Sequence, residues 1–220
     1  PIFCHVLLAD EINRTSPKVQ AALLEAMAEK QSTIDNNTYK LDELFFVIAT
    51  QNPLDLAGTY PLPSAQLDRF LFKIKMTHIS KASELDLLMR LDTVIGKVPV
   101  DLPMVTRKEI LDLRETMRRQ VHVAPEIKEA LVHFADETRE SNLSLQGIST
   151  RSLVLAIPAL QAHALLHQRD YVTPEDIVAL APYIFAHRLM MAPGSNTPEE
   201  LVEQALQRPL ELISKQSLRR

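Results

Sequence analysis

Two adjacent carboxylates, Asp10 and Glu11, directly follow an apolar run over residues 2–9. Such a run predicts a strand buried on both faces, as in a parallel sheet, and α/β folds bind ligands at the carboxyl edge of such sheets. Phosphoryl transfer needs an acid that holds Mg²⁺, usually through water, and a group that orients or deprotonates the attacking water. Asp10 fits the metal role and Glu11 the role of base. Acidic residues also end strands simply by entering turns, so both interpretations stay open for this pair alone.

An amide, Asn52, follows a second apolar run over residues 44–50. If the two predicted strands are parallel, Asn52 lies at the same sheet edge as Asp10. An amide can hydrogen-bond both a γ-phosphate oxygen and the attacking water. The alternative is that Asn52 and Pro53 only start a turn, and taken alone this alternative is favoured.

Two arginines could meet an anion from other elements. Arg69 follows Asp68 at the end of a short predicted helix. It can pair with Asp68, the better interpretation without further context, or reach across an interface to a phosphate. Arg151 falls in the first turn of a helix that Ser149 can cap. A cation there opposes the helix dipole, which favours an anionic partner.

The elements that would position these residues follow from the apolar and turn patterns. A helix is predicted over residues 17–30, capped by Thr15 or Ser16. Asn36 and Asn37 can form the turn of a hairpin that precedes the second strand. Strand, helix, hairpin and strand together make a βαβ crossover with an inserted hairpin. A loop, a short helix and a third strand are expected over residues 51–63, 64–70 and 71–76.

From about residue 80 the pattern indicates helices only. The predicted helices cover residues 83–93, 106–119, 126–140, 149–167, 174–188 and 198–206. The fold class is therefore α/β followed by all-α. We predict a partial nucleotide-binding α/β domain over 1–78, a linker with a first helix over 79–105, and a helical domain over 106–220.

The composition narrows the class further. Only four of the 220 residues are glycine, and none begins a G-x-x-x-x-G-K-[ST] phosphate loop. Few glycines also argue against an all-β sandwich. The one cysteine, Cys4, cannot form an internal disulfide and is expected to be an inert core residue in a reducing compartment. No apolar run is long enough to span a membrane, and the net charge of −4 does not favour nucleic-acid binding.

Taken together, these segments resemble the AAA+ ATPase core from its Walker B strand onward, most closely the MoxR family. LLADEINR resembles Walker B, FFVIATQNP the sensor-1 strand, TYPLPSAQLDRF the arginine-finger segment, GISTRS sensor 2, and YVTPEDIVALAPYIFAHRL the family's lid. The resemblance covers nearly the whole chain. It implies the C-terminal half of a parallel-sheet P-loop NTPase core plus a helical lid. The Walker A segment would lie upstream, so we expect the chain to be the C-terminal part of a longer protein.

The resemblance implies a role for each candidate residue. Asp10 would order the Mg²⁺ shell through water, and Glu11 would activate water for attack on the γ-phosphate of ATP. Asn52 would position that water. Arg69 would act in trans on the neighbouring subunit's nucleotide, and Arg151 would contact the γ-phosphate in cis. Each of the five side chains would bind the metal, act on the attacking water or stabilise the charge on the phosphoryl oxygens.

The family also implies a cytoplasmic, chaperone-like ATPase that remodels or matures a protein partner. An arginine finger needs a neighbour, so a hexameric homo-oligomer is expected, and partners with a von Willebrand factor A domain are typical. Two alternatives are a non-catalytic oligomerisation or interaction module, because the chain alone lacks Walker A, and a DNA-acting AAA+ ATPase. Arg14 matches the family pattern without an assignable role. His163 and His167 have the spacing of metal ligands but no third ligand, so zinc is not favoured.

Overall fold

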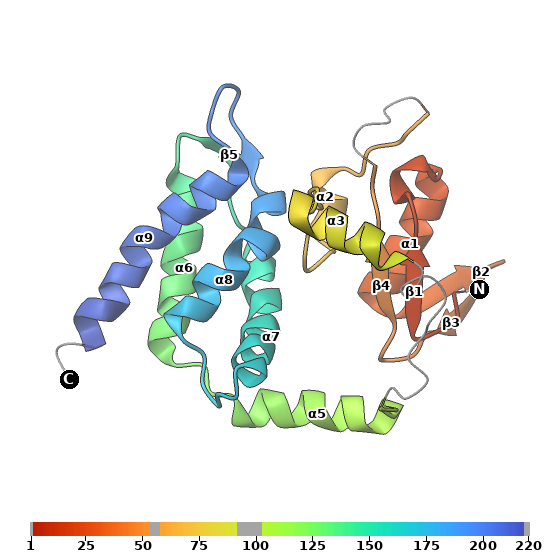
Figure 1. Cartoon of the computed structure of the whole chain (residues 1–220), viewed down its shortest axis with the longest axis horizontal. Coiled ribbons are helices and arrows are strands. Elements are labelled where there is room, and N and C mark those ends of the chain that lie inside the picture. The colour runs from red at the N-terminus through yellow and green to blue at the C-terminus, as the bar shows by residue number, and fades with distance from the viewer. Residues whose placement is uncertain (1, 53–57, 92–102, 218–220) are drawn as a thin grey trace.

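The computed structural model describes residues 2–52, 58–91 and 103–217. The α/β elements lie on one side and the bundle of C-terminal helices on the other, with α5 (Arg107–Gln120) running beneath both (Figure 1). Thr106 begins α5 and forms a capping box with Glu109, a pattern visible in the sequence as Thr-x-x-Glu. Arg107 Nε lies 2.9 Å from Asp42 Oδ2, so an ion pair attaches α5 to the loop before the second sheet strand.

The sheet at the centre of the α/β part consists of β1 (Val6–Ala9) and β4 (Phe46–Ala49), which pair in parallel from Val6 with Phe46 to Ala9 with Ala49. This pairing is the one expected from the sequence. The connecting helix α1 (Pro17–Glu29) begins after Ser16 and ends at Lys30 in the left-handed conformation, close to the predicted bounds.

Only one face of this sheet is covered. Leu7, Ala9, Val47 and Ala49 pack against the cluster that contains Leu23 and Leu24 of α1. On the opposite face the side chains of Val6, Leu8, Phe46 and Ile48 are exposed. The expectation of strands buried on both faces is therefore wrong for the described part of the chain, because no described element lies over that second face.

The hairpin inserted before β4 consists of β2 (Gln31–Ile34) and β3 (Asn37–Lys40). Its turn is formed by Asp35 and Asn36, which both have positive φ. The sequence places this turn one residue too late, at Asn36 and Asn37. Because Ile34 pairs with Asn37 in the ladder, Asn37 belongs to the strand.

The third expected strand, over residues 71–76, is not present. These residues are extended but join no sheet, and Lys73 N–H donates instead to the carbonyl of Tyr183 in α8 (Pro174–Phe185), at 2.9 Å. No described strand lies beside the segment, so its backbone cannot form a ladder there. The segment follows α2 (Ser64–Leu67) and leads to α3 (Lys81–Met89).

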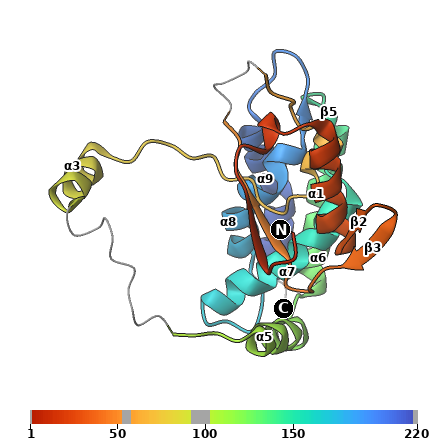
Figure 2. The same cartoon turned by 90° about the vertical axis from the view of Figure 1, so that its right-hand side faces the viewer.

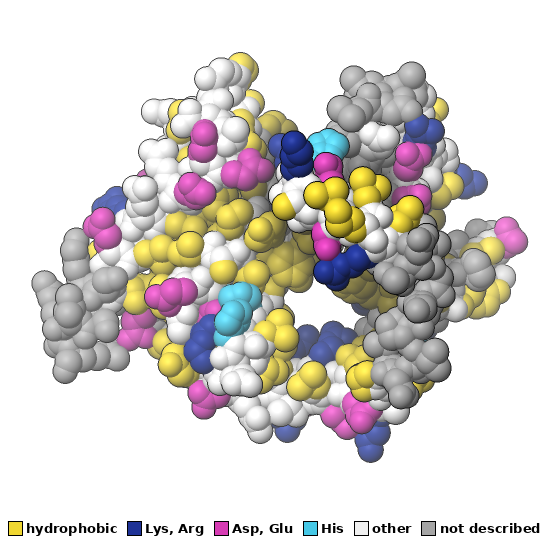
Figure 3. All heavy atoms as spheres, in the orientation of Figure 1, with side chains coloured by type: hydrophobic (Ala, Val, Ile, Leu, Met, Phe, Trp, Pro, Cys, Tyr) yellow, Lys and Arg dark blue, Asp and Glu magenta, His cyan; other side chains and the backbone are white. Residues whose placement is uncertain are grey.

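The helix α3 projects away from the other described elements on an extended arm (Figure 2). Hydrophobic side chains gather on its surface, with Leu85, Leu88 and Met89 each more than half exposed (Figure 3). The expected linker over 79–105 lies partly outside the described residues. The three-region division of the chain stays a prediction.

The helical bundle has its own core. It contains α6 (Pro125–Glu140), α7 (Thr150–Leu166), α8 and α9 (Pro198–Ser217), close to the predicted helices except that α9 continues past residue 206. The rings of Phe134 and Phe185 meet at 5.0 Å in this core, and both side chains are fully buried. The sequence does not predict the two short antiparallel strands β5 (Ser144–Gln146) and β6 (Met190–Met191).

Candidate functional site

The carboxyl ends of β1 and β4 are tied together by Thr50, the residue that follows β4. Its hydroxyl donates to Asp10 Oδ1 and accepts the N–H of Glu11 at 2.8 Å. Its backbone N–H donates to Ala9 O, and its carbonyl accepts from Ile12 N, both at 3.0 Å. Thr50 thus fixes both the side chain of Asp10 and the backbone of Glu11. The sequence analysis overlooks Thr50, although the hydroxyl at the end of an apolar strand is a visible signal.

Glu11 has a left-handed backbone, with φ 47° and ψ 52°. A non-glycine residue adopts this conformation at a cost, and it persists where surrounding contacts determine it. The hydrogen bond to Thr50 is one such contact, and the 3-10 helix η1 (Ile12–Arg14) begins directly afterwards. The carboxylate of Glu11 lies 2.9 Å from Arg14 Nε. Arg14, to which the sequence assigned no role, is therefore the ion-pair partner of Glu11.

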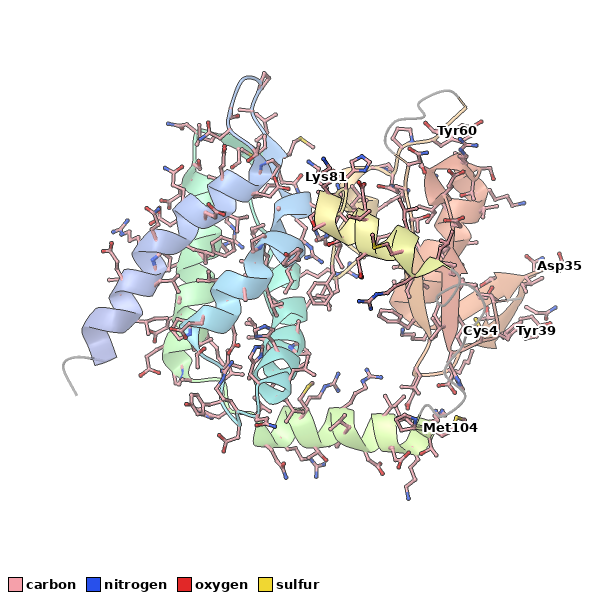
Figure 4. All side chains as sticks on the ribbon, in the orientation of Figure 1. Cys4, Asp35, Tyr39, Tyr60, Lys81 and Met104 are labelled. Atoms are coloured by element: carbon pink, nitrogen blue, oxygen red, sulfur yellow. The ribbon has the colours of Figure 1, made fainter. Side chains whose placement is uncertain are left out.

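Asn52 joins the same region through its main chain. The buried side chain of Asn13 donates through Nδ2 to Asn52 O at 3.3 Å, and Asn13 O accepts from Tyr60 N at 2.6 Å. Tyr60 lies close to α1 (Figure 4). Gln20 of α1 is also buried, and its Nε2 donates to three carbonyls that surround this turn: Ile12, Thr15 and Tyr60. The strand ends, Asn52 and Tyr60 are therefore held as one unit.

Arg69 is half-buried at the end of the α2 segment and donates through one guanidinium nitrogen to Leu24 O of α1, at 2.9 Å. The alternative, a salt bridge between Arg69 and Asp68, is wrong, because the described residues show no ion pair between these two side chains. Asp68 Oδ1 instead lies 2.8 Å from Arg188 Nε, in the 3-10 helix η2 (Ala186–Arg188) that follows α8. The Arg69 side chain thus contacts α1, whereas the Asp68 side chain contacts η2.

Arg151 is exposed in the first turn of α7, as the sequence predicts. The hydroxyl of Ser149 caps this helix by accepting the N–H of Ser152 at 3.2 Å. Ser152 in turn donates through its hydroxyl to Asp68 Oδ1 at 3.1 Å. The helix that carries Arg151 is therefore bound directly to the segment that carries Arg69.

Arg188 and His187 complete this contact between the helical bundle and the α/β part. The side chain of Arg188 is only 2% exposed, and it donates to the carbonyls of Asp68, Phe70, Leu71 and Ile184 as well as to the Asp68 carboxylate. Burial lowers the pKa of Arg188, and the Asp68 carboxylate opposes that effect. His187 Nε2 donates to Phe70 O at 3.1 Å, and burial together with Arg188 lowers the pKa of His187 to about 4.

Of the two histidines, only His163 in α7 contacts a carboxylate among the described residues; His167, just after α7, donates through Nδ1 to His163 O at 3.0 Å. His163 Nδ1 lies 2.6 Å from Oδ1 of the fully buried Asp176, which Arg169 also holds through both carboxylate oxygens. Burial acts to raise the pKa of Asp176, but hydrogen bonds from Arg169, Thr173 N–H and His163 outweigh it and lower the pKa far below its usual range. Within residues 2–52, 58–91 and 103–217, no cluster of three or more metal-ligating side chains is present.

The five predicted site residues thus fall into two groups. Asp10, Glu11 and the main chain of Asn52 meet at the end of the β1–β4 sheet. Arg69 and Arg151 belong to segments joined through Asp68. None of the described helices combines the length and the apolar character needed to cross a membrane.

Two family models match the chain. Residues 1–72 match the ATPase family associated with various cellular activities (AAA), and residues 136–208 match the AAA lid domain. The chain is 45% identical to the protein YeaC of Bacillus subtilis over 193 residues, which cover 88% of this chain and 60% of YeaC. It is 34% identical to the chaperone MoxR1 of Mycobacterium tuberculosis, over 97% of this chain and 58% of that protein.

A solved structure agrees with these matches. The crystal structure of a candidate ATPase from Cytophaga hutchinsonii superposes with a TM-score of 0.86 at 36% identity, covering 94% of this chain and 66% of that one. The chain therefore spans about three fifths of the length of the curated relatives named above.

Proposed function

Because the chain belongs to the MoxR family of AAA+ ATPases, we propose that the whole protein binds and hydrolyses ATP at the carboxyl edge of the β1–β4 sheet. The observation that carries this proposal is the junction at Thr50, which holds Asp10 and Glu11 together at that edge. The carboxylate that holds the metal and the carboxylate that acts as base must be held in a fixed geometry to act on one phosphoryl group.

The donor set at the sheet edge fits Mg²⁺, which prefers carboxylate and water oxygens. Asp10 would hold the ion through water, with its Oδ1 fixed by the Thr50 hydroxyl. Bound there, Mg²⁺ would neutralise part of the charge on the phosphate oxygens of ATP. Asn52 would orient the attacking water, since its main chain is anchored to the turn that follows Glu11.

Glu11 would accept the proton of the attacking water. Its Oε2 is ion-paired with Arg14 Nε at 2.9 Å, which fixes the orientation of the carboxylate. Arg151 would contact the γ-phosphate in cis, from the exposed first turn of α7. Arg69 would stabilise the developing charge on the nucleotide of a neighbouring subunit.

The direct test is the Glu11→Gln variant of the whole protein, compared with the wild type. Gln keeps the size of the side chain and removes the base, so ATP affinity should stay within about threefold while turnover falls by at least about 100-fold. ATP binding is measured by equilibrium titration and turnover by phosphate release. Undiminished phosphate release in Glu11→Gln would contradict the assignment of the base.

We further propose that ATP hydrolysis drives remodelling or maturation of a protein client by a ring of subunits. The support is the identity to a relative named as a chaperone. A client with a von Willebrand factor A domain, a hexameric ring and a cytoplasmic location remain parts of this proposal. Isolation of the whole protein with a client, followed by ATP-dependent release of that client, would test it. A client that stays bound with and without ATP would argue against remodelling.

A further inference from the structure

The carboxylate of Asp68 occupies a central position between the two parts of the molecule. It is adjacent in sequence to Arg69, and its Oδ1 accepts hydrogen bonds from Arg188 Nε at 2.8 Å and from Ser152 at 3.1 Å. Both donors belong to the helical bundle, Ser152 to α7 and Arg188 to η2. We refer to Asp68, Ser152 and Arg188 as the Asp68 junction.

The Asp68 junction also fixes the backbone around Arg69. Arg188 donates through one guanidinium nitrogen to the carbonyls of Asp68 at 3.2 Å and Phe70 at 2.8 Å, which lie immediately before and after Arg69. The side chain of Arg188 is 2% exposed, so water cannot replace these contacts without opening the interface. A buried guanidinium with several fixed acceptors is a rigid anchor.

We propose that Asp68 is a positioning residue through which the helical bundle sets the placement of Arg69 for the neighbouring subunit's nucleotide. This inference rests on the function proposed above. Because Arg151 directly precedes Ser152 in α7, a nucleotide bound by Arg151 in one subunit would act through Ser152 and Asp68 on Arg69. The Asp68 junction thereby links the nucleotide state of one subunit to the catalytic competence of the next.

The placement of Arg69 by the Asp68 junction depends mainly on the negative charge of Asp68. Asn at this position has the same shape and its Oδ1 can still accept both hydrogen bonds, but it carries no charge, so the buried Arg188 loses its carboxylate partner. Arg188 then keeps only carbonyl acceptors, and its hold on the backbone beside Arg69 weakens. Arg69 would keep its hydrogen bond to Leu24 O, but the backbone on either side of it would no longer be fixed by the helical bundle.

The test is a subunit-mixing experiment on the whole protein. Asp68→Asn subunits have an intact nucleotide site and a misplaced Arg69, whereas Glu11→Gln subunits have an inactive site and an intact Arg69. We expect Asp68→Asn alone to lower turnover by about tenfold or more with the KM for ATP within about twofold of wild type. Mixing it with Glu11→Gln should raise turnover several-fold above the sum of the two separate proteins.

Two comparisons keep the outcomes distinct. The pair Arg69→Ala and Glu11→Gln is mixed in parallel, and Asp136→Asn serves as the matched control because Asp136 forms an exposed ion pair with Arg139, within α6. Asp136→Asn should keep wild-type turnover. If Arg69→Ala is not restored by mixing, the proposed trans role of Arg69 fails, and this inference fails with it.

If Arg69→Ala is restored by mixing but Asp68→Asn is not, Asp68 serves only its own subunit and the inference alone is overturned. Wild-type turnover in Asp68→Asn would also overturn it. Should Asp68→Asn not fold, Ser152→Ala removes one hydroxyl from the Asp68 junction and leaves the charge pair intact. That variant should lose turnover about threefold, and an equal mixture with Glu11→Gln should give about twice the turnover of the two proteins kept apart; failure on either point counts against the inference.

Discussion

His187 makes the stability of the contact between the bundle and the α/β part depend on pH. Its Nε2 donates to Phe70 O, and its buried Nδ1 has no hydrogen-bond partner in the structure. Protonation would add a second N–H to the ring at Nδ1, where no acceptor among the described residues receives it. Burial, followed by the positive charge of Arg188, accordingly lowers the pKa of His187 from 6.5 to about 4.

The sign and size of the effect follow from that shift. Between pH 4 and 6.5 the unfolded chain binds a proton at this histidine and the folded chain does not, so the free energy of unfolding rises with pH across this window. The contribution is complete above pH 6.5 and is lost as the pH falls towards 4. A shift of this size corresponds to about 3 kcal/mol, which we reduce to about 2 kcal/mol because the imidazole is partly exposed to solvent.

The perturbation is His187→Gln, because Gln can still donate to Phe70 O and does not titrate. Urea unfolding of the wild-type and variant chains at pH 7.5 and pH 4.5 gives the free energy of unfolding under each condition. We expect the wild type to lose about 2 kcal/mol more than the variant between the two pH values. The other six histidines are common to both proteins, so their contributions cancel in this comparison. Equal losses in the two proteins would refute the argument.

Three further predictions follow from the site and the bundle. Thr50→Val in the whole protein should lower ATP turnover by about tenfold or more, because it removes the hydroxyl that binds both Asp10 and Glu11 N–H. The turnover of Thr50→Ser should stay within about threefold of wild type. Equal turnover in the two variants would contradict the role of the hydroxyl. Asp176→Asn should reduce the free energy of unfolding by about 2–4 kcal/mol, because Arg169 and His163 lose a fully buried anion as their partner. Urea unfolding at pH 7 measures this loss, and an unchanged free energy of unfolding would contradict the prediction. The 220-residue chain by itself contains no G-x-x-x-x-G-K-[ST] loop, so it should bind a fluorescent ATP analogue more weakly than the micromolar range, and micromolar binding in a titration would show that other groups hold the phosphates.

The helices and the parallel strand pair could be predicted because each depends on local pattern. Ser16 and Pro17 mark the start of α1, the capping box at Thr106 marks α5, and Thr173 followed by Pro174 marks α8. The apolar runs before Asp10 and Asn52 predict two strands, and their parallel pairing places both polar ends at one edge. Sequence alone was sufficient for this much of the candidate site.

The rest depends on partners distant in the sequence. Residues 71–76 have the composition of a strand, but a strand needs a neighbour, and this segment contacts Tyr183 instead. The apolar side chains of β1 alternate between a covered and an exposed face, which the continuous apolar run does not reveal. The pairing of Asp68 with Arg188 joins residues 120 positions apart, so proximity in sequence favoured the wrong partner, Arg69.

The claim that Arg69 completes the site of a neighbouring subunit is tested most directly by titrating Arg69→Ala subunits of the whole protein with Glu11→Gln subunits at constant total concentration. Each variant alone should be nearly inactive. If subunits mix at random in a ring, the fraction of interfaces with both an intact site and an intact Arg69 is greatest at equal amounts, and turnover should peak there at roughly a quarter of the wild-type value. Turnover that stays at the baseline at every ratio would contradict a shared site.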